Sequence, residues 1–450
     1  MSTWLRRLAF FVPFAVAAGF MLWPTRPSDR TGDGRIIVTY WEKWTGFEGQ
    51  AIRDAVDRFN DTVGREKGIY VQLFIQGDIE EKVKIAAAGG APPDLAGLYS
   101  FNVAVYASQN ALVPLDEMLA EAGIGERDFI PSYWRLCRHD GRTWCLPTAP
   151  ATLALFWNKR LFREAGLDPD RPPRTLEELT AIGHRLTAAD PDTGRIERMG
   201  FLPSEPGWWS YAWGWWFGGR LWDGEDAIAA TEPENLEAFR WIEEQYVDRY
   251  GPKNLADFKG GLGKFASADN GFFTGKVAME LQGVWFPNFI DRYAPEGFEY
   301  GVAPIPPARG TGLENVTIAE ADVIGIPRGA RHVEEAFEFV KFLASVEGME
   351  ILCKGQGKHS SLAKTSPGFL DPETHPNPHV ELFYTLAFSP NAKRTPALGL
   401  WREYQREMSV AFDNIWNGNE EPAAALKNVQ TRMQRRLDQE LRRRRLVGKE

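Results

Sequence analysis

The chain has 450 residues, which exceeds what one hydrophobic core usually supports, so we expect at least two lobes. Its composition, 44% hydrophobic and 25% charged, is typical of a globular protein, and its net charge of -9 argues against nucleic acid as a partner. A content of 13% aromatic residues, including 17 Trp, favours binding sites that use flat apolar surfaces.

The first segment has the pattern of an export signal. Arg6 and Arg7 precede an uncharged apolar run over residues 8–23, and a linker rich in Pro and charged residues follows. The run is slightly long for a signal-peptide core and slightly short for a relaxed membrane span, so cleavage and retention as a membrane tether both stay open. We assign residues 1–35 to a signal peptide or anchor plus linker, and we expect the rest to be periplasmic or otherwise extracytoplasmic.

Strands and helices alternate after the linker. The hydrophobic pattern predicts strands within 35–44, 69–77 and 92–100, and helices within 48–64 and 78–90. This alternation predicts an α/β fold with a mostly parallel sheet covered by helices. Ligands of such sheets bind beyond the carboxyl ends of the strands, which selects the loops that contain Trp44, Glu48, Asp78, Tyr99 and Asn102.

Two of the three Cys residues bracket a predicted hairpin turn at Asp140 and Gly141. A two-residue loop would place Cys137 opposite Trp144, whereas a three-residue loop would place Cys137 opposite Cys145. Because the protein carries an export signal, we expect a disulfide between Cys137 and Cys145, although the turn leaves both pairings open.

A second lobe is expected to begin near Pro147. The pattern there predicts a strand, a short helix and then a helix capped by Thr175, with Glu178 three residues further on. Residues 201–300 are predicted to be largely helical, including 272–293. A strand is expected within 299–310, a strand followed by a helix within 321–345, and helices over 401–416 and 421–441.

Residues 207–219 hold five Trp in thirteen positions. At helical spacing Trp209, Trp213 and Trp216 share one stripe, while Trp208, Tyr211 and Trp215 share a neighbouring one, and one core needs only one such face. We expect Trp213 and Trp216 to be buried in a core. We expect Trp208 and Trp209, beside Pro206 and Gly207, to form a ligand surface.

Five segments, in this order along the chain, carry a resemblance to a known family: GGAPPDL (89–95), LALFWNKRLFREAGLDPDRPPRTLEEL (153–179), FFTGKVAMELQGVW (272–285), GIPRGARHVEEAFEFVKFLASVEGME (325–350) and NGNEEPAAALKNVQTRM (417–433). Together they resemble the large carbohydrate-binding class of solute-binding proteins that serve bacterial ABC transporters. The resemblance implies two α/β lobes that close like a hinge on the ligand, with crossings near Ala149, near residues 302–305 and near Ala344.

The resulting domain prediction places lobe 1 at residues 36–148 and 306–344. It places lobe 2 at residues 149–305 and 345–440, and a basic C-terminal tail at 441–450.

The resemblance also implies stacking residues for a sugar. It points to Trp208 at the start of the Trp-rich stretch, to Trp285 in the GVW sequence and, through a looser match, to Trp401. Where maltose-binding relatives carry polar contacts after a strand, this chain has Leu98, Phe101 and Asn102, so maltose itself is not the expected ligand.

A pyranose has apolar faces and a rim of hydroxyl groups, so its binding site needs aromatic planes and hydrogen-bonding groups. Glu48, Asp78, Glu205 and Glu320 are the carboxylates expected to accept hydroxyl hydrogens in such a site. We therefore expect a solute-binding protein that captures a sugar or oligosaccharide between its lobes and delivers it to the transmembrane subunits of an ABC permease.

We expect this protein to be a monomer and not an enzyme, with no cofactor and no metal site. Two alternatives stay open. A membrane-tethered carbohydrate sensor would share the fold, and an exported glycoside hydrolase would also stack sugars on Trp but would need two carboxylates beside the scissile bond.

Overall fold

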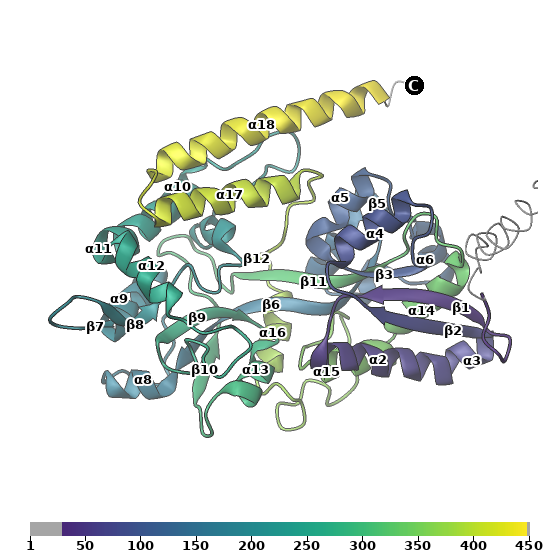
Figure 1. The fold of residues 1–450 in the computed structure, drawn as a ribbon, viewed down its shortest axis with the longest axis horizontal. Helices are drawn as coiled ribbons and strands as arrows, with labels where there is room; N and C mark the ends of the chain where they lie inside the picture. Colours follow the sequence, from purple (N-terminus) through teal and green to yellow (C-terminus); the bar gives the residue numbers. More distant parts are fainter. Residues whose placement is uncertain (1–28, 448–450) are drawn as a thin grey trace, which may run out of the picture.

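The computed structural model of the protein describes residues 29–447 (Figure 1). These residues form a mixed α/β fold around a ten-stranded sheet with the strand order β2-β1-β3-β11-β6-β9-β8-β7, in which β10 pairs with β6 and β12 pairs with β11. A separate two-stranded hairpin is formed by β4 and β5. The predicted signal or anchor over residues 8–23 lies outside the described residues.

The strands are β1 (Ile36–Glu42), β2 (Ile69–Ile75), β3 (Leu95–Tyr99), β4 (Arg138–His139), β5 (Arg142–Thr143), β6 (Leu146–Asn158), β7 (Ala188–Ala189), β8 (Ile196–Phe201), β9 (Val277–Gly283), β10 (Tyr300–Ala303), β11 (Thr317–Gly325) and β12 (Ala392–Lys393). The α-helices are α2 (Gly46–Asp61), α3 (Val63–Lys67), α4 (Ile79–Ala88), α5 (Val103–Ser108), α6 (Asp116–Ala122), α7 (Pro131–Leu136), α8 (Lys159–Glu164), α9 (Leu176–Leu186), α10 (Pro233–Ile242), α11 (Asp248–Tyr250), α12 (Pro252–Gly260), α13 (Phe286–Tyr293), α14 (Val333–Leu343), α15 (Val346–Gly355), α16 (Val380–Ala387), α17 (Trp401–Trp416) and α18 (Pro422–Val447).

The first core forms around β1, β2 and β3, which pair in parallel as the alternating pattern predicts. Apolar side chains of β1, α2, α14 and α15 meet in one buried cluster that includes Val38, Phe59 and Phe339. Helix α15 lies directly on α2, since a Cβ atom added at Gly355 would come within 2.7 Å of the Ala51 Cβ. The prediction that assigned residues 345–440 to the second lobe is therefore wrong for α15, because an amphipathic pattern does not specify the partner that it packs against.

Strands β6 and β11 connect the two halves of the molecule (Figure 1). Strand β11 pairs antiparallel with β3 near its carboxyl end and with β6 along its length, and β6 in turn pairs antiparallel with β9. The centre of the sheet is thus antiparallel, and the expected parallel pairing is found among β1, β2 and β3, between β8 and β9, and between β11 and β12. Residues 277–283, expected to be helical, form β9, and all seven are buried. A strand buried on both faces lacks the alternation that identifies strands in a sequence.

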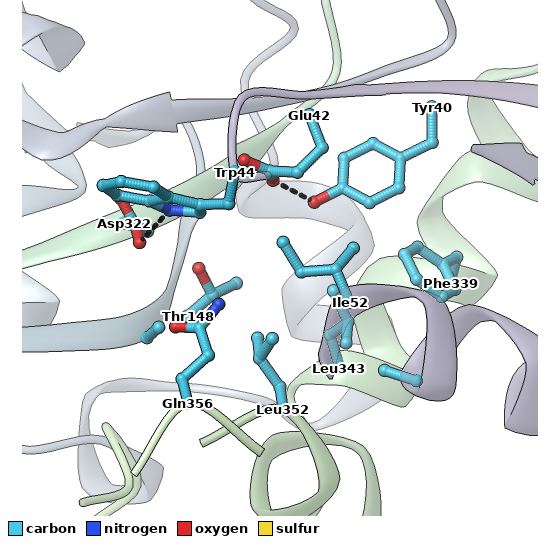
Figure 2. A pocket seen from close by; sticks show the side chains of 12 residues that line it. Tyr40, Glu42, Trp44, Ile52, Thr148, Asp322, Phe339, Leu343, Leu352 and Gln356 are labelled. Carbon is cyan, nitrogen blue, oxygen red and sulfur yellow. Dashed lines mark hydrogen bonds between the residues drawn. The ribbon is translucent and has the colours of Figure 1, made fainter. Parts of the chain in front are cut away.

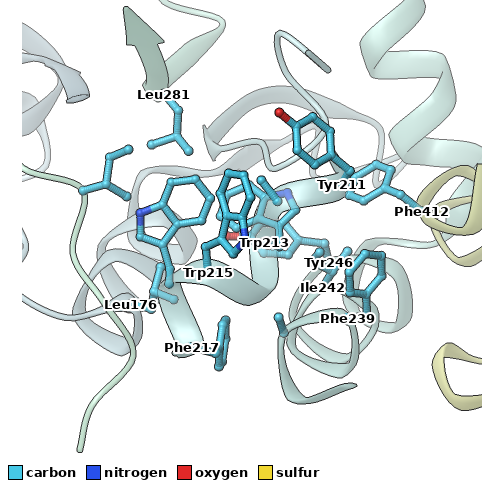
Figure 3. Close-up of a cluster of buried hydrophobic side chains, with 14 of the residues drawn as sticks. Leu176, Tyr211, Trp213, Trp215, Phe217, Phe239, Ile242, Tyr246, Leu281 and Phe412 are labelled. Atoms are coloured by element: carbon cyan, nitrogen blue, oxygen red, sulfur yellow. The ribbon is translucent and has the colours of Figure 1, made fainter. Parts of the chain in front are cut away.

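The second core is built on the Trp-rich stretch (Figure 3). Residues Ser210–Phe217 form a 3₁₀ helix, η3, rather than the expected α-helix. Trp213 and Trp216 are buried as predicted, with ring centroids 5.4 Å apart, and Trp213 also packs edge-on against Phe201 of β8. Because η3 is almost wholly buried, its aromatic residues hold the preceding residues, Trp208 and Trp209, at a fixed position.

The C-terminal helices lie on the second core. Helix α17 has the predicted bounds, and α18 packs beside it with Leu426, Val429 and Met433 buried. Helix α18 continues to residue 447, so the predicted tail is helical over residues 441–447. No helix within residues 29–447 is both long enough and apolar enough to cross a membrane.

The cysteine hairpin adopts the two-residue turn at Asp140 and Gly141. Backbone pairing joins Arg138 to Thr143, and the Trp144 amide donates to the Cys137 carbonyl at 2.9 Å. This register places Cys137 opposite Trp144, and both Cys137 and Cys145 are free, buried thiols. The expected disulfide is therefore not formed in this structure, and burial raises the pKa of the Cys137 thiol.

Candidate functional site

A cavity of about 630 Å³ lies between the two cores. Its lining comes from the carboxyl ends of β1 and β3, from the start of α2, from the crossing strands β6 and β11, from the segment after α15, and from segments of the second half of the molecule. The lining residues are Trp44, Glu48, Tyr99, Phe101, Ala151, Trp208, Trp209, Tyr211, Phe265, Ala266, Trp285, Phe289, Glu320, Ala321, Asp322, Lys358 and Gln405. This volume is in the range of pockets that bury a small organic ligand.

The first aromatic wall consists of Trp44, Tyr99 and Phe101. The ring of Tyr99 stacks on Phe101 at 5.0 Å and meets Trp44 edge-on at 5.9 Å. Trp44 follows β1, Tyr99 is the last residue of β3 and Phe101 follows it, so all three lie at the carboxyl ends of neighbouring parallel strands. Burial raises the pKa of the Tyr99 phenol to about 12, so this phenol is a neutral hydrogen-bonding group at ordinary pH.

The second aromatic wall consists of Trp208, Trp209, Trp285, Phe265 and Phe289. Trp285 lies 6.4 Å from Trp208 and 6.2 Å from Trp209, and Phe265 lies 5.0 Å from Trp208, all measured between ring centroids. Trp208 is 46% exposed, which is unusual for an indole in a folded protein. This wall therefore presents flat apolar surface to the cavity and to solvent.

Asp322 anchors Trp44 in the first wall (Figure 2). The Trp44 indole N–H donates to Asp322 Oδ2 at 2.7 Å, and the Lys43 ammonium lies 3.0 Å from Asp322 Oδ1. Behind Trp44, Tyr40 donates to Glu42 at 2.5 Å, and the space enclosed there is only about 10 Å³. Burial lowers the pKa of Lys43, but the negative charges of Asp322 and Glu42 outweigh this effect and keep the pKa above its ordinary value.

Two further carboxylates lie between the walls. Glu48 Oε1 forms an ion pair with the Lys358 ammonium at 3.1 Å. Glu320, on the crossing strand β11, accepts a hydrogen bond from the Thr395 hydroxyl and also interacts with Tyr211. Burial raises the pKa of Glu320, although these hydrogen bonds oppose the effect.

The cavity brings together seven of the residues that the sequence analysis selected. They are Trp44, Glu48, Tyr99, Trp208, Trp209, Trp285 and Glu320. Four other selected residues lie elsewhere.

Trp401 is fully buried in the second core, where its ring packs edge-on against Tyr211 at 5.3 Å and against Tyr404 at 5.9 Å. It is therefore not placed to stack on a ligand, and the expectation for Trp401 is wrong. Trp401 supports the cavity indirectly, through Tyr211.

The other three residues also lie away from the cavity lining. Asp78 is exposed and precedes α4 with a positive φ of 52°. The Asn102 side chain is buried and donates to Glu80. Glu205 lines a separate, much smaller space together with Trp209, and burial raises its pKa. The rule that loops at carboxyl strand ends face the ligand selects segments, but it does not show which side chain of a segment points inward.

Ten other lining residues were not predicted from the sequence. Apart from three Ala, they are Phe101, Tyr211, Phe265, Phe289, Asp322, Lys358 and Gln405. Asp322 and Lys358 could not be selected because their significance comes from ion pairs with residues far away in the chain. Among the described residues, no group of three or more His, Cys, Asp or Glu is placed to hold a metal ion.

Comparison with known proteins identifies the family of this chain. The model of the family described as bacterial extracellular solute-binding protein matches residues 48–350. The structure is similar to that of CpMnBP1 with mannotriose bound, with a TM-score of 0.76 and 27% sequence identity, covering 88% of this chain and 99% of that one.

Two curated relatives are more distant in sequence. A binding protein of Brucella abortus is 23% identical over 414 residues, which cover 92% of this chain and 95% of the relative. The sn-glycerol-3-phosphate-binding periplasmic protein of Salmonella typhimurium is 26% identical over 318 residues, covering 67% of this chain and 65% of the relative. The relatives thus include a protein named for a phosphorylated polyol and one bound to a neutral oligosaccharide.

Proposed function

This chain belongs to the family of bacterial extracellular solute-binding proteins, and from that membership we propose that its cavity captures an oligosaccharide for delivery to a membrane permease. The family consists of binding proteins that act outside the cytoplasm and work with ABC permeases. The observation that supports a carbohydrate ligand is the pair of facing aromatic walls with carboxylates between them.

The chemistry of the two walls suits a sugar ring. Indole faces remove the apolar face of a pyranose from water, at roughly 25 cal/mol per Å² of apolar surface buried. Carboxylates such as Glu48 accept hydroxyl hydrogens, and charge-assisted hydrogen bonds are roughly twice as strong as neutral ones. Because Trp44 packs against the first core and Trp285 against the second, a sugar held between them would contact both halves of the molecule at once.

Capture by closure follows from the same arrangement. The proposed hinge lies in β6 and β11, the strands that connect the two cores. A ligand that contacts both walls stabilises the form in which they are close together, and so shifts the population toward it. We propose that this closed form is the one that a permease recognises, with the protein acting as a monomer.

Isothermal titration calorimetry tests the proposal. The probes are mannobiose, mannotriose, maltotriose and tagatose, with chromatography of each mixture to detect cleavage. Binding of at least one sugar without cleavage is the expected result. Absence of binding to every sugar, or release of shorter sugars, would contradict the proposed function.

A further inference from the structure

Lys358 is a buried cation at the junction of the two aromatic walls. Only 2% of the residue is exposed. Its Nζ lies 5.4 Å from the ring centroid of Trp44 and 5.9 Å from that of Trp285, so the ammonium contacts one indole of each wall. Glu48 Oε1 completes the surroundings at 3.1 Å. Two indoles and a carboxylate are the groups that a site for a cationic ligand would use, and here a side chain of the protein already fills that position.

The backbone around Lys358 is held from both cores. The Gln356 side-chain amide donates to the Glu48 carbonyl at 3.2 Å, and the Asn288 side chain of α13 donates to the Gln356 carbonyl at 2.5 Å. Gly357 has a φ of +62°, and a Cβ atom there would lie 2.4 Å from the Asn288 amide nitrogen. Because these contacts fix the segment, the ammonium is held between the indoles.

The positive charge of the second lysine at the site, Lys43, is also balanced by a carboxylate. The Lys43 ammonium lies 3.0 Å from Asp322, whose carboxylate lines the cavity. Lys358 is the only Lys or Arg among the lining residues, and it is paired with Glu48. Both lysines are therefore paired with carboxylates, and the remaining lining carboxylate, Glu320, is hydrogen-bonded to Thr395 and Tyr211.

We infer that Lys358 is a specificity-determining residue that restricts the cavity to uncharged ligands, an inference that rests on the proposed function. A phosphate or carboxylate would face Glu48 and Asp322 with both nearby ammonium groups already paired. An ammonium group would meet the Lys358 charge at short range, where repulsion is strong in a partly desolvated site. The hydroxyls of a neutral sugar avoid both costs, since they donate to Glu48 and accept from Lys358.

Calorimetry on the full chain and three variants tests this inference. The probes are mannotriose, sn-glycerol-3-phosphate, and the disaccharide of glucosamine at a pH where its amines are protonated. The variants are Lys358→Met, the double variant Glu48→Gln with Lys358→Met, and Lys354→Met. Lys354 is exposed on α15 and does not line the cavity, so it provides the same change of charge elsewhere.

We expect the unmodified protein to bind mannotriose and neither charged probe. Lys358→Met, which leaves Glu48 without its partner between two indoles, should bind the glucosamine disaccharide at least about tenfold more tightly than the weakest binding that the calorimeter detects for the unmodified protein. The double variant should lose this gain, and Lys354→Met should never show it.

Two results would overturn the inference. One is binding of sn-glycerol-3-phosphate or the glucosamine disaccharide by the unmodified protein as tightly as mannotriose. The other is a folded Lys358→Met variant, checked by thermal unfolding, with no gain for the cationic probe. The affinities of the unmodified protein for mannotriose and for the two charged probes can be compared without any variant. This comparison therefore tests the inference even if Lys358→Met does not fold. If mannotriose and the other neutral sugars fail to bind while Lys358→Met gains the cationic probe, the proposed carbohydrate function fails and the role of Lys358 stands.

Discussion

Trp285 joins the second aromatic wall to the buried Lys358 ammonium. It lies near Trp208 and Trp209, and its ring is 5.9 Å from the Lys358 ammonium. We predict that Trp285→Ala weakens sugar binding at least about tenfold, which corresponds to roughly 1.4 kcal/mol. Titration calorimetry measures this effect, and thermal unfolding checks that the variant is folded. An unchanged affinity would remove Trp285 from the ligand site.

Trp401 provides the matched contrast, because it is an equally large side chain with no exposed surface. We predict that Trp401→Ala costs about 3–5 kcal/mol in the free energy of unfolding, as expected for a buried Trp that leaves a cavity. Urea denaturation measures this loss. If Trp401→Ala kept its stability but lost its affinity for sugar, Trp401 would belong to the ligand site. The buried position of its ring in this structure would then differ from its position in the sugar-bound protein.

At the level of elements, the sequence predicts regular segments better than it predicts their partners. Amphipathic helices such as α2 and α17 were predicted from their periodicity, and the Thr175 cap of α9 is confirmed by a 3.2 Å hydrogen bond from the Glu178 amide. Strand β9 was missed because both of its faces are buried. The position of α15 was missed because its apolar face would suit either core.

At the site, too, the sequence indicates single residues better than it indicates their partners. Aromatic residues such as Trp208 and Trp285 could be selected individually, because exposed or loop-borne indoles are uncommon and fit a sugar. The ion pairs of Lys358 with Glu48 and of Lys43 with Asp322 join residues about 280–310 positions apart in the chain. No local pattern contains that information.

The segment after α15 joins several elements through buried polar groups, and this makes its stability sensitive to pH. His359 is fully buried, and its Nε2 lies 2.8 Å from the Thr152 hydroxyl of β6 and 3.2 Å from the Tyr133 hydroxyl of α7. Burial lowers the pKa of His359 to about 3 from an ordinary value of 6.5. The unfolded chain therefore binds the proton more readily, and stability falls as the pH drops from 6.5 toward 3.

We predict that His359 accounts for about 2 kcal/mol of the stability lost between about pH 7 and pH 5. The free energy of unfolding in urea, measured at both values, should therefore fall more for the unmodified protein than for His359→Gln. Equal losses in the two proteins would show that His359 is not the group responsible.

At the scale of the whole molecule, a contact between α2 and α13 also joins the two halves. Phe47 of α2 lies 5.6 Å from the ring of Phe289, and the Arg292 guanidinium of α13 lies 4.4 Å from the Phe47 ring. If closure on the ligand uses this contact, its loss should weaken binding although Phe47 does not line the cavity.

We predict that Phe47→Ala lowers sugar affinity between about twofold and tenfold, since an aromatic pair contributes about 0.5–1.5 kcal/mol beyond its burial. Phe74→Ala, which removes a 39% exposed ring on β2, is the control and should bind as the unmodified protein does. Equal sugar affinities of the unmodified protein, Phe47→Ala and Phe74→Ala would show that closure on the ligand does not depend on this contact.

The central claim is that an oligosaccharide lies between the two aromatic walls of the cavity. A crystal structure of the protein with bound mannotriose, or with whichever sugar of the panel binds most tightly, tests it most directly. We predict sugar rings stacked on Trp285 and Trp208, with hydroxyls within hydrogen-bonding distance of Glu48 and Lys358. A sugar bound elsewhere, with these indoles packed only against other side chains, would contradict the claim.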